Sequence, residues 1–341
     1  MKTPRRYRVA LAGYYGFGNL GDELLLEASI AALLRCGVAR ERIVALSNNP
    51  DDSRRKFGVD AVDRWKIPQV YRALGRSETF LLGGGGLFQD ATSLRSCVYY
   101  WGLVRGAAFQ GAVPWALGQS VGPLRSRFAR WLTRDALKRC RVVQVRDRAT
   151  LSLCETLGLN ANVELGHDLA FSLSGVFFEN NPGNQVSKLL VNLRPCADGL
   201  PERFAKAVSA YASAFTGDVL GVALSEEDEC LMRRLTDEKL LFLPRIERVA
   251  TFLDAVRVFH GAKAAVGMRL HFAILATLTS TPLVVAPYDP KVEAFASDGN
   301  IPMWRGGPLP PPQLPAAVFS PEALRKEIDV LCRNILESER L

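Results

Sequence analysis

Short apolar runs alternate with amphipathic stretches along most of the chain, which predicts parallel β-strands joined by α-helices. In the first half the expected strands are Tyr7–Ala12, Arg42–Leu46, Thr79–Leu82, Val113–Leu117 and Val142–Val145. The expected helices are Asp22–Cys36, Ser93–Phe109 and Arg127–Lys138. The first of these carries an apolar stripe at helical spacing, formed by Leu24, Leu25, Ala28, Ala31 and Ala32.

The pattern restarts after Glu179–Ser187, whose Asn, Pro and Gly content is typical of a linker. The strands expected beyond it are Lys188–Leu193, Val219–Leu224, Leu240–Leu243, Ala262–Val266 and Leu283–Ala286. The expected helices are Pro201–Ala214, Glu226–Leu235, Val249–Phe259, Leu270–Leu278 and Pro321–Leu336. The fold class that follows is α/β, with two doubly wound, Rossmann-like domains facing each other across a cleft. Their bounds are residues 1–180 and 188–310, followed by a crossover and helix in 311–341.

Composition places the chain among ordinary folded proteins, because 48% of its residues are hydrophobic and 23% are charged. Lys and Arg outnumber Asp and Glu by 43 to 35, and the net charge of +8 favours an anionic partner. The seven cysteines stand singly, which is typical of reduced thiols and disfavours a zinc cluster or a disulfide framework. No apolar stretch is a credible membrane span. We therefore expect a soluble, cytoplasmic protein.

The segment Gly16–Gly21 has the G-x-G-x-x-G spacing of a dinucleotide fold and lies between a strand and a helix. Asp22 and Glu23 follow where a pyrophosphate would need positive potential, and no ribose-binding carboxylate ends the second strand. An NAD site is therefore disfavoured. A plain turn with Asp22 as a helix cap stays open. We favour a turn in which Asn19 and Asp22 contact a hydroxyl group of a ligand.

Four glycines, Gly83–Gly86, follow the expected strand Thr79–Leu82. Glycine lets a backbone approach a ligand closely, and ligands bind at the carboxyl ends of strands in open α/β sheets. The loop, with Gly84 and Gly85 at its centre, is therefore a candidate binding element. Gln89 and Asp90 come directly after it.

Cationic side chains stand at three strand ends of the second half. Arg269 and His271 flank Leu270, Arg194 follows the first strand, and Lys291 follows Tyr288-Asp289-Pro290. A guanidinium group can grip a carboxylate or phosphate, and imidazole can move a proton near neutral pH. These residues predict a phosphate pocket, although a lone histidine can equally be structural.

A basic stretch, Arg125–Arg141, carries seven Lys and Arg side chains against the single acid Asp135. It would suit an anionic membrane surface or nucleic acid, while a solvated helix face remains the simpler alternative. No nucleic-acid-binding motif accompanies it, so we expect no nucleic-acid partner, while a peripheral contact with the inner face of a membrane stays open.

Several blocks together resemble the polysaccharide pyruvyl transferase family, the CsaB-like enzymes. They occur in the family's order over both halves: Gly13–Glu23, Gly83–Gly86 with Gln89-Asp90, Gly118–Pro123, Val145–Asp147, Arg269–His271 and Tyr288–Lys291. Each block is weak alone, whereas the ordered set is specific. Gly166-His167-Asp168 departs from the family pattern, so His167 is left out of the catalytic set.

The resemblance implies a GT-B-like fold and transfer of pyruvate from phosphoenolpyruvate to a sugar as a ketal. It implies that Arg269, Leu270 and His271 contact phosphoenolpyruvate, with Arg146 and Lys291 at further matching positions. The Asn19–Asp22 block and the glycine loop are then acceptor-side elements of the N-terminal domain. His271 would be the acid/base and Arg269 would stabilise developing charge. Phosphoenolpyruvate would be the co-substrate, the acceptor would be lipid-linked, and no metal or other cofactor is expected.

Three rival functions stay open. The first is a nucleotide-sugar-dependent glycosyltransferase of the same GT-B shape, which should bind a UDP or GDP sugar. The second is a membrane- or nucleic-acid-binding module that uses Arg125–Arg141. The third is an NAD enzyme, which would require nicotinamide-dependent absorbance changes.

Overall fold

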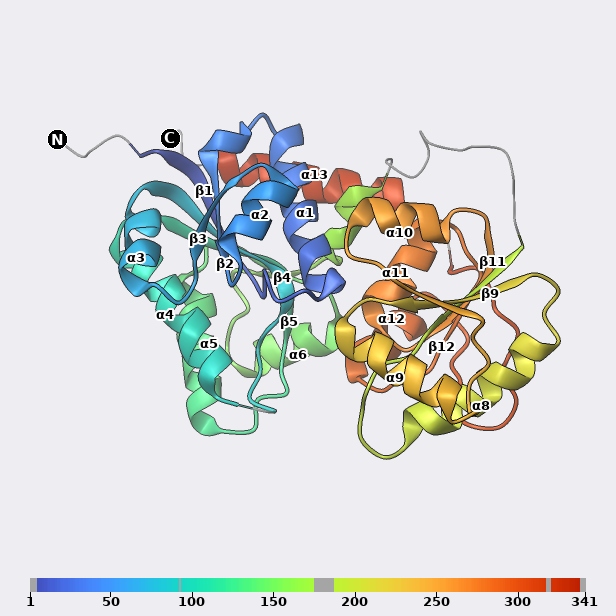
Figure 1. Cartoon of the computed structure of the whole chain (residues 1–341). Coiled ribbons are helices and arrows are strands. Elements are labelled where there is room, and N and C mark those ends of the chain that lie inside the picture. Colours follow the sequence, from blue (N-terminus) through green and yellow to red (C-terminus); the bar gives the residue numbers. More distant parts are fainter. Residues whose placement is uncertain (1–4, 92, 175–186, 317–319, 338–341) are drawn as a thin grey trace. The chain divides into compact units, whose positions relative to one another are not determined.

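The computed structural model describes residues 5–91, 93–174, 187–316 and 320–337 (Figure 1). The chain divides into two compact units. The first comprises Met1–Phe17, Leu25–Ser172 and Lys326–Leu341, and the second comprises Gly18–Leu24 and Leu173–Arg325. The short segment Gly18–Leu24 therefore groups with residues from Leu173 onward, far from it in the sequence. Most of the expected linker, residues 179–186, lies outside the described residues.

The first unit is built on a parallel seven-stranded sheet with the order β3-β2-β1-β4-β5-β6-β7. The strands are β1 Tyr7–Ala12, β2 Ile43–Ser47, β3 Asp60–Asp63, β4 Ser77–Phe88, β5 Val113–Val121, β6 Val143–Val145 and β7 Val163–Leu165. Val9 pairs with Ile43 on one side and with Thr79 on the other, so the strand order reverses between β1 and β4. Ligands bind at such reversals in open α/β sheets.

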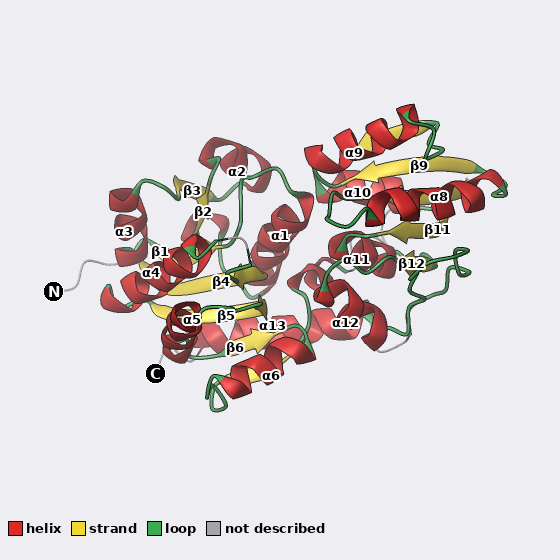
Figure 2. Ribbon diagram, turned by 90° about the horizontal axis from the view of Figure 1, so that it is seen from below, coloured by secondary structure: helices red, strands yellow, loops and turns green. Residues whose placement is uncertain are grey.

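The helices of this unit are α1 Leu20–Arg35, α2 Pro50–Phe57, α3 Ile67–Gly75, α4 Arg95–Phe109, α5 Arg127–Arg139 and α6 Arg148–Thr156. Ser126 caps α5 and Asp147 caps α6 through side-chain oxygens, which accept backbone N–H groups left without intrahelical partners. Apolar side chains from the strands and from α4 and α5, among them Phe80 and Leu132, form its core. Figure 2 shows helices on both sides of the strands.

The second unit holds a parallel five-stranded sheet with the order β10-β9-β8-β11-β12. Its strands are β8 Lys188–Asn192, β9 Asp218–Ala223, β10 Arg245–Arg248, β11 Ala262–Gly267 and β12 Leu283–Val285. Its helices are α8 Leu200–Ser213, α9 Glu226–Asp237, α10 Phe252–Phe259, α11 Leu270–Leu278 and α12 Pro290–Asp298. Here the strand order reverses between β8 and β11. This sheet and the first confirm the expected doubly wound α/β class.

The C-terminal helix α13 spans Pro321–Glu337. Residues up to Arg325 group with the second unit, and those from Lys326 group with the first. The preceding Pro- and Gly-rich segment contains no helix among its described residues, but it adds isolated bridges at Met303 and Gln313 to β12.

Two expectations about strands are wrong. Leu240–Leu243 is not a strand, because Leu241 and Leu243 are buried in the core while the edge strand is the polar segment β10 that follows. Gly83–Gly86 is not a loop after a strand, since β4 continues through all four glycines to Phe88. Gly83 and Gly85 pair with Leu117 and Gln119 of β5.

No helix among the described residues is long and apolar enough to cross a bilayer.

Candidate functional site

The Asn19–Asp22 motif meets His271 within the second unit. Asn19 stands at the N-cap of α1: its carbonyl accepts the N–H groups of Asp22 and Glu23, and its side-chain oxygen accepts that of Gly21 at 3.2 Å. The cap is thus Asn19 and not Asp22, whose carboxylate accepts the Asn19 amide at 2.6 Å. Gly21 faces the imidazole so closely that a Cβ atom there would overlap His271 Nδ1.

This turn is also anchored to the second sheet. The Leu20 N–H donates to the carbonyl of Leu224, just beyond β9, at 2.9 Å. Gly18 has a positive φ of 74°, a conformation that glycine adopts without strain. The turn therefore depends on a glycine at each end: Gly18 adopts the positive φ, and Gly21 leaves room for the His271 imidazole.

Arg269 is held by a buried carboxylate that sequence analysis missed. Its Nε donates to Asp228 Oδ2 at 2.5 Å, and its Nη2 donates to Asp228 Oδ1 at 2.6 Å and to Ser225 Oγ at 2.8 Å. The Asp228 side chain is 0% exposed and that of Arg269 is 12% exposed. Burial would lower the pKa of the Arg269 guanidinium, but the hydrogen bonds and charge of Asp228 outweigh burial and raise it.

The hydrogen bonds of Arg269 to Asp228 and Ser225, called the Arg269 clamp below, limit which guanidinium atoms can bind a ligand. The edge of the guanidinium formed by Nε and Nη2, which could grip a carboxylate through two bonds, is already occupied by Asp228. Within the described part of the chain, the side-chain hydrogen bonds of Arg269 come from Nε and Nη2, so Nη1 could bind an external anion. Asn192, at the end of β8, fixes the backbone as well, because its side-chain oxygen accepts the Arg269 N–H at 3.1 Å.

Arg194 and Tyr288 form a second cationic element at the carboxyl ends of β8 and β12. Arg194 Nη1 donates to the Tyr288 hydroxyl at 2.6 Å, and the guanidinium carbon lies 4.3 Å from the ring centroid. Burial raises the pKa of Tyr288 even though the charges of Arg194 and Arg269 both lower it. The hydroxyl therefore stays protonated at neutral pH, within the field of two arginines.

Lys291 and Leu270 occupy helix starts at the same edge. Asp289 caps α12, and its carboxylate lies 3.6 Å from Lys291 Nζ. Leu270 is the first residue of α11 and is buried. Arg269 precedes α11 at the N-cap position without a side-chain cap, so the positive end of the helix dipole adds to the arginine charges.

Arg146 lies in the first unit and is committed to an internal ion pair. Its Nη1 donates to Asp168, and both side chains are buried. Its Nε donates to Ser120 Oγ at 2.7 Å, and that hydroxyl donates in turn to Asp147 at 2.7 Å. The network ties the end of β5 to the residues after β6.

The glycines of β4 make room for neighbouring side chains of the same unit. A Cβ atom at Gly83 would overlap the Tyr15 hydroxyl, which donates to the Gly83 carbonyl at 3.0 Å. At Gly84 it would meet Leu25 at 3.1 Å and Leu169 at 3.4 Å. Internal packing is therefore enough to account for Gly83 and Gly84. Gly84 and Gly85 both have a positive φ, of 80° and 96°.

Gln89 and Asp90 organise the segment after β4. The Gln89 side-chain oxygen accepts the Ala91 N–H at 3.0 Å. Asp90 accepts the Arg125 N–H at 2.6 Å and the Ser126 N–H at 2.7 Å. Desolvation would raise the pKa of Asp90, but these backbone donors lower it below its ordinary value. Asp90 thus ties the segment after β4 to the start of α5.

A buried arginine ringed by aromatic side chains was also missed. Arg64 follows β3 and donates to the Gly13 carbonyl at 2.9 Å and to the Tyr100 hydroxyl at 3.3 Å. Its guanidinium carbon lies 4.4 Å from the Tyr99 ring centroid and 5.3 Å from that of Trp65, which is largely exposed. The aromatic residues are far apart in the sequence, so no local motif predicted that they would surround Arg64.

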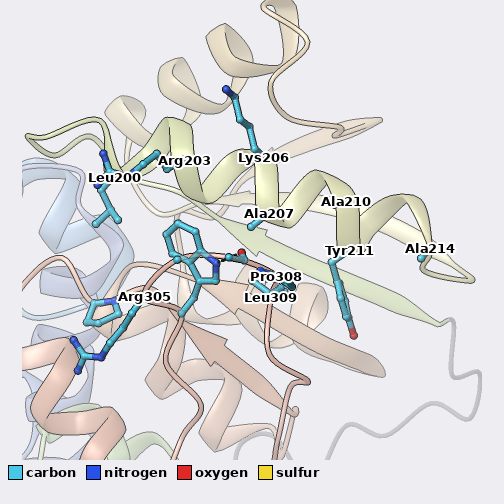
Figure 3. Close-up of a pocket in the computed structure, with 14 residues that line it drawn as sticks. Leu200, Arg203, Lys206, Ala207, Ala210, Tyr211, Ala214, Arg305, Pro308 and Leu309 are labelled. Carbon is cyan, nitrogen blue, oxygen red and sulfur yellow. Dashed lines mark hydrogen bonds between the residues drawn. The ribbon is translucent and has the colours of Figure 1, made fainter.

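A pocket of about 940 Å³ lies in the second unit between α8 and residues 304–309 (Figure 3). Ala207, Tyr211 and Trp304 are among its apolar lining, and Arg203 and Arg305 are among its charged residues. None of the sequence-predicted site residues lines it. Among the residues that the structure describes, no cluster of His, Cys, Asp and Glu could hold a metal ion.

The structure thus groups the predicted residues by unit. The turn with Asn19 and Asp22 meets His271 in the second unit through Gly21. Arg269, two residues before His271, shares the carboxyl edge of the same sheet with Arg194 and Lys291. Gly84, Gly85, Gln89, Asp90 and Arg146 belong to the first unit.

Several solved structures share the fold over most of this chain. HepE from Anabaena, in complex with UDP and glucose, aligns with a TM-score of 0.57 and 10% identity over 97% of this chain and 95% of that one. A putative UDP-N-acetylglucosamine 2-epimerase from Listeria monocytogenes aligns with a TM-score of 0.59 and 10% identity, over 98% of this chain and 90% of that one. A glycosyltransferase from Rickettsia africae aligns with a TM-score of 0.53 and 12% identity, over 98% of this chain and 92% of that one. At this identity the likeness shows the GT-B-like fold alone.

No curated protein matches the chain by sequence. Residues 19–290 match the family described as polysaccharide pyruvyl transferase. The match begins at the helix cap Asn19 and ends at Pro290, beside Lys291. Because this match spans most of the chain, including every residue of the Gly21–His271 contact and of the Arg269 clamp, the protein belongs to the polysaccharide pyruvyl transferase family.

Proposed function

We propose that this protein transfers pyruvate from phosphoenolpyruvate to a sugar as a ketal and releases phosphate. The observation that carries the proposal is the meeting of two family blocks, Asn19–Asp22 and Arg269–His271, at one histidine on the carboxyl edge of the second sheet. A titratable side chain beside fixed cations at such an edge is the arrangement that proton transfer to an anionic substrate requires.

The donor is a trianionic molecule at full ionisation, so its site must supply positive charge. The Nη1 side of Arg269 and the uncapped start of α11 offer it at β11, and Arg194 offers it at β8. Lys291 adds a further cation beside β12, tempered by Asp289. We assign phosphoenolpyruvate to this edge, with Leu270 as an apolar contact.

The reaction needs one proton at C3 of phosphoenolpyruvate while a sugar hydroxyl adds to C2. That hydroxyl gives up its proton, so C3 gains a hydrogen and C2 gains a C–O bond. A second hydroxyl then forms the other C–O bond at C2 as the bond to phosphate breaks, and its proton leaves with phosphate. His271 is the acid/base for these transfers, and the two arginines stabilise the charge that collects on phosphate.

The acceptor is assigned to the first unit. Exposed Trp65 and Tyr14, beside the ends of β3 and β1, offer the aromatic surface against which a sugar ring packs. We propose a lipid-linked sugar as this acceptor and the cytoplasm, at the inner face of the membrane, as the site of the reaction. Gly84, Gly85, Gln89, Asp90 and Arg146 would then shape the acceptor side through the internal contacts described above.

The alternative is a glycosyltransferase that uses a nucleotide sugar, which the likeness to HepE bound to UDP and glucose keeps in view. The two are separated by their donors. Incubation with phosphoenolpyruvate carrying a ¹³C-labelled C3, together with a panel of lipid-linked disaccharides, is followed by mass spectrometry of the product. Labelled ketal without added nucleotide supports the proposal. Sugar transfer from UDP-glucose with no label incorporated would replace it with the alternative.

A further inference from the structure

Helix α5 of the first unit presents a one-sided charged surface. Ala129, Leu132, Thr133, Ala136 and Leu137 are buried and face the core. The opposite side is exposed and basic, and it includes Arg127, Arg134 and Lys138. Among the described residues these three side chains make no ion pair with an acidic group.

The single acid of the helix does not offset this charge. Asp135 lies 3.1 Å from Arg139 and 3.5 Å from Arg105 of α4, and it accepts the indole N–H of Trp101 at 2.8 Å. Its partners are therefore already in place, and the exposed cations remain available to an external anion.

Two aromatic rings lie among these cations. Phe128 and Trp131 are 52% and 53% exposed, their ring centroids are 5.9 Å apart and their planes differ by 6°. Trp101 of α4 lies behind them, with its ring centroid 6.0 Å from that of Trp131. A face on which exposed aromatic rings alternate with unpaired cations is typical of proteins that rest on a lipid headgroup layer.

We propose that this surface, defined as Arg127, Phe128, Trp131, Arg134 and Lys138 and called the α5 surface below, docks on an anionic lipid bilayer. The cations match anionic headgroups, and the two rings enter the interface. Nucleic acid fits less well, because no nucleic-acid-binding motif accompanies this surface in the sequence. The inference does not depend on the reaction proposed above, since binding to lipid is measured without substrate.

The test is flotation of the full-length protein with vesicles. Wild type is expected to float with vesicles of equal parts phosphatidylcholine and phosphatidylglycerol, and not with phosphatidylcholine alone. The double variants Arg134→Glu/Lys138→Glu and Phe128→Ser/Trp131→Ser should each lower the bound fraction by about tenfold or more. Circular dichroism checks that they fold.

A matched control is Arg203→Glu/Lys206→Glu on α8, which changes the net charge equally and alters exposed side chains of the second unit. It should float as wild type does. Failure of wild type to float with anionic vesicles would overturn the proposal, as would an equal loss in the α8 control. Binding of a single-stranded oligonucleotide through the α5 surface without vesicle binding would also overturn it.

Discussion

Gly21 lies against the imidazole of His271, and no side chain larger than hydrogen fits between them. The glycine is in the first turn of α1 and the histidine is in the first turn of α11, near opposite ends of the sequence. Because Asn19 fixes the turn and Leu20 ties it to Leu224, the histidine has a rigid backbone as its neighbour. A proton-transferring group benefits from such a fixed position.

Replacing Gly21 with Ala should lower kcat by about tenfold to a hundredfold, because the added methyl group displaces the imidazole from its position. Thermal unfolding should show a moderate loss of stability, because overpacking against the imidazole costs about 1–3 kcal/mol and the better helix propensity of Ala, about 0.5–1 kcal/mol, offsets only part of it. Gly102→Ala in α4 is the matched control, because a Cβ atom there meets nothing within 4 Å. Normal turnover in Gly21→Ala would show that His271 need not hold this position.

Asp228 is expected to matter through Arg269. Asp228→Asn removes the charge that balances a buried guanidinium, which should destabilise the fold by about 3–5 kcal/mol and raise the KM for phosphoenolpyruvate. The neighbouring Glu229→Gln loses only a partly exposed pair with Arg233, and it should cost about 0–1 kcal/mol with KM unchanged. Denaturant unfolding and donor titrations measure both. An unchanged KM in a folded Asp228→Asn variant would rule out a positioning role.

The Tyr288 hydroxyl should orient Arg194 toward the donor. Tyr288→Phe keeps the ring under the guanidinium but removes the hydrogen bond at 2.6 Å, so the KM for phosphoenolpyruvate should rise by about tenfold with kcat little changed. Because burial raises the pKa of Tyr288, wild-type KM should not respond to ionisation of this hydroxyl up to its ordinary pKa of about 10. A titration in donor affinity below that pH, lost in Tyr288→Phe, would contradict this picture.

Asp90 should contribute to stability in a pH-dependent way. Its folded-state pKa is lowered, so its contribution is full above the unfolded pKa of about 3.9 and is lost as pH falls through the folded value. Asp90→Asn should therefore cost about 1 kcal/mol at neutral pH. The difference from wild type should shrink in acid. Denaturant unfolding at several pH values measures it, and a difference that grows below pH about 4 has the wrong sign.

Much of the framework could be predicted from apolar patterning. β1 and α11 have the expected bounds, and most other strands shift by a few residues at their ends. The short strands β3 and β7 were missed, because Asp60–Asp63 and Val163–Leu165 carry too few apolar side chains to stand out. The strand expected at Leu240–Leu243 was wrong because burial there comes from core packing without sheet pairing.

The site was predictable only in part. Arg269, His271, Arg194 and Lys291 were found because cations after strands meet at one edge of a parallel sheet. Asp228 could not be found in this way, since its role depends on burial against Arg269 and not on any local pattern. Gly83 and Gly84 suggested space for a ligand, but the space is filled by Tyr15, Leu25 and Leu169, which only the tertiary structure brings there.

The most direct test of the account is phosphate release from phosphoenolpyruvate by wild type and His271→Ala, with a panel of lipid-linked disaccharides and no nucleotide present. We expect wild type to release phosphate only with an accepted sugar, in equal amount to the ketal formed. His271→Ala should be folded and should have lost nearly all turnover. No release by wild type with any acceptor, together with tight binding of a nucleotide sugar, would contradict the proposed function; near-normal turnover in His271→Ala would contradict the role of the histidine.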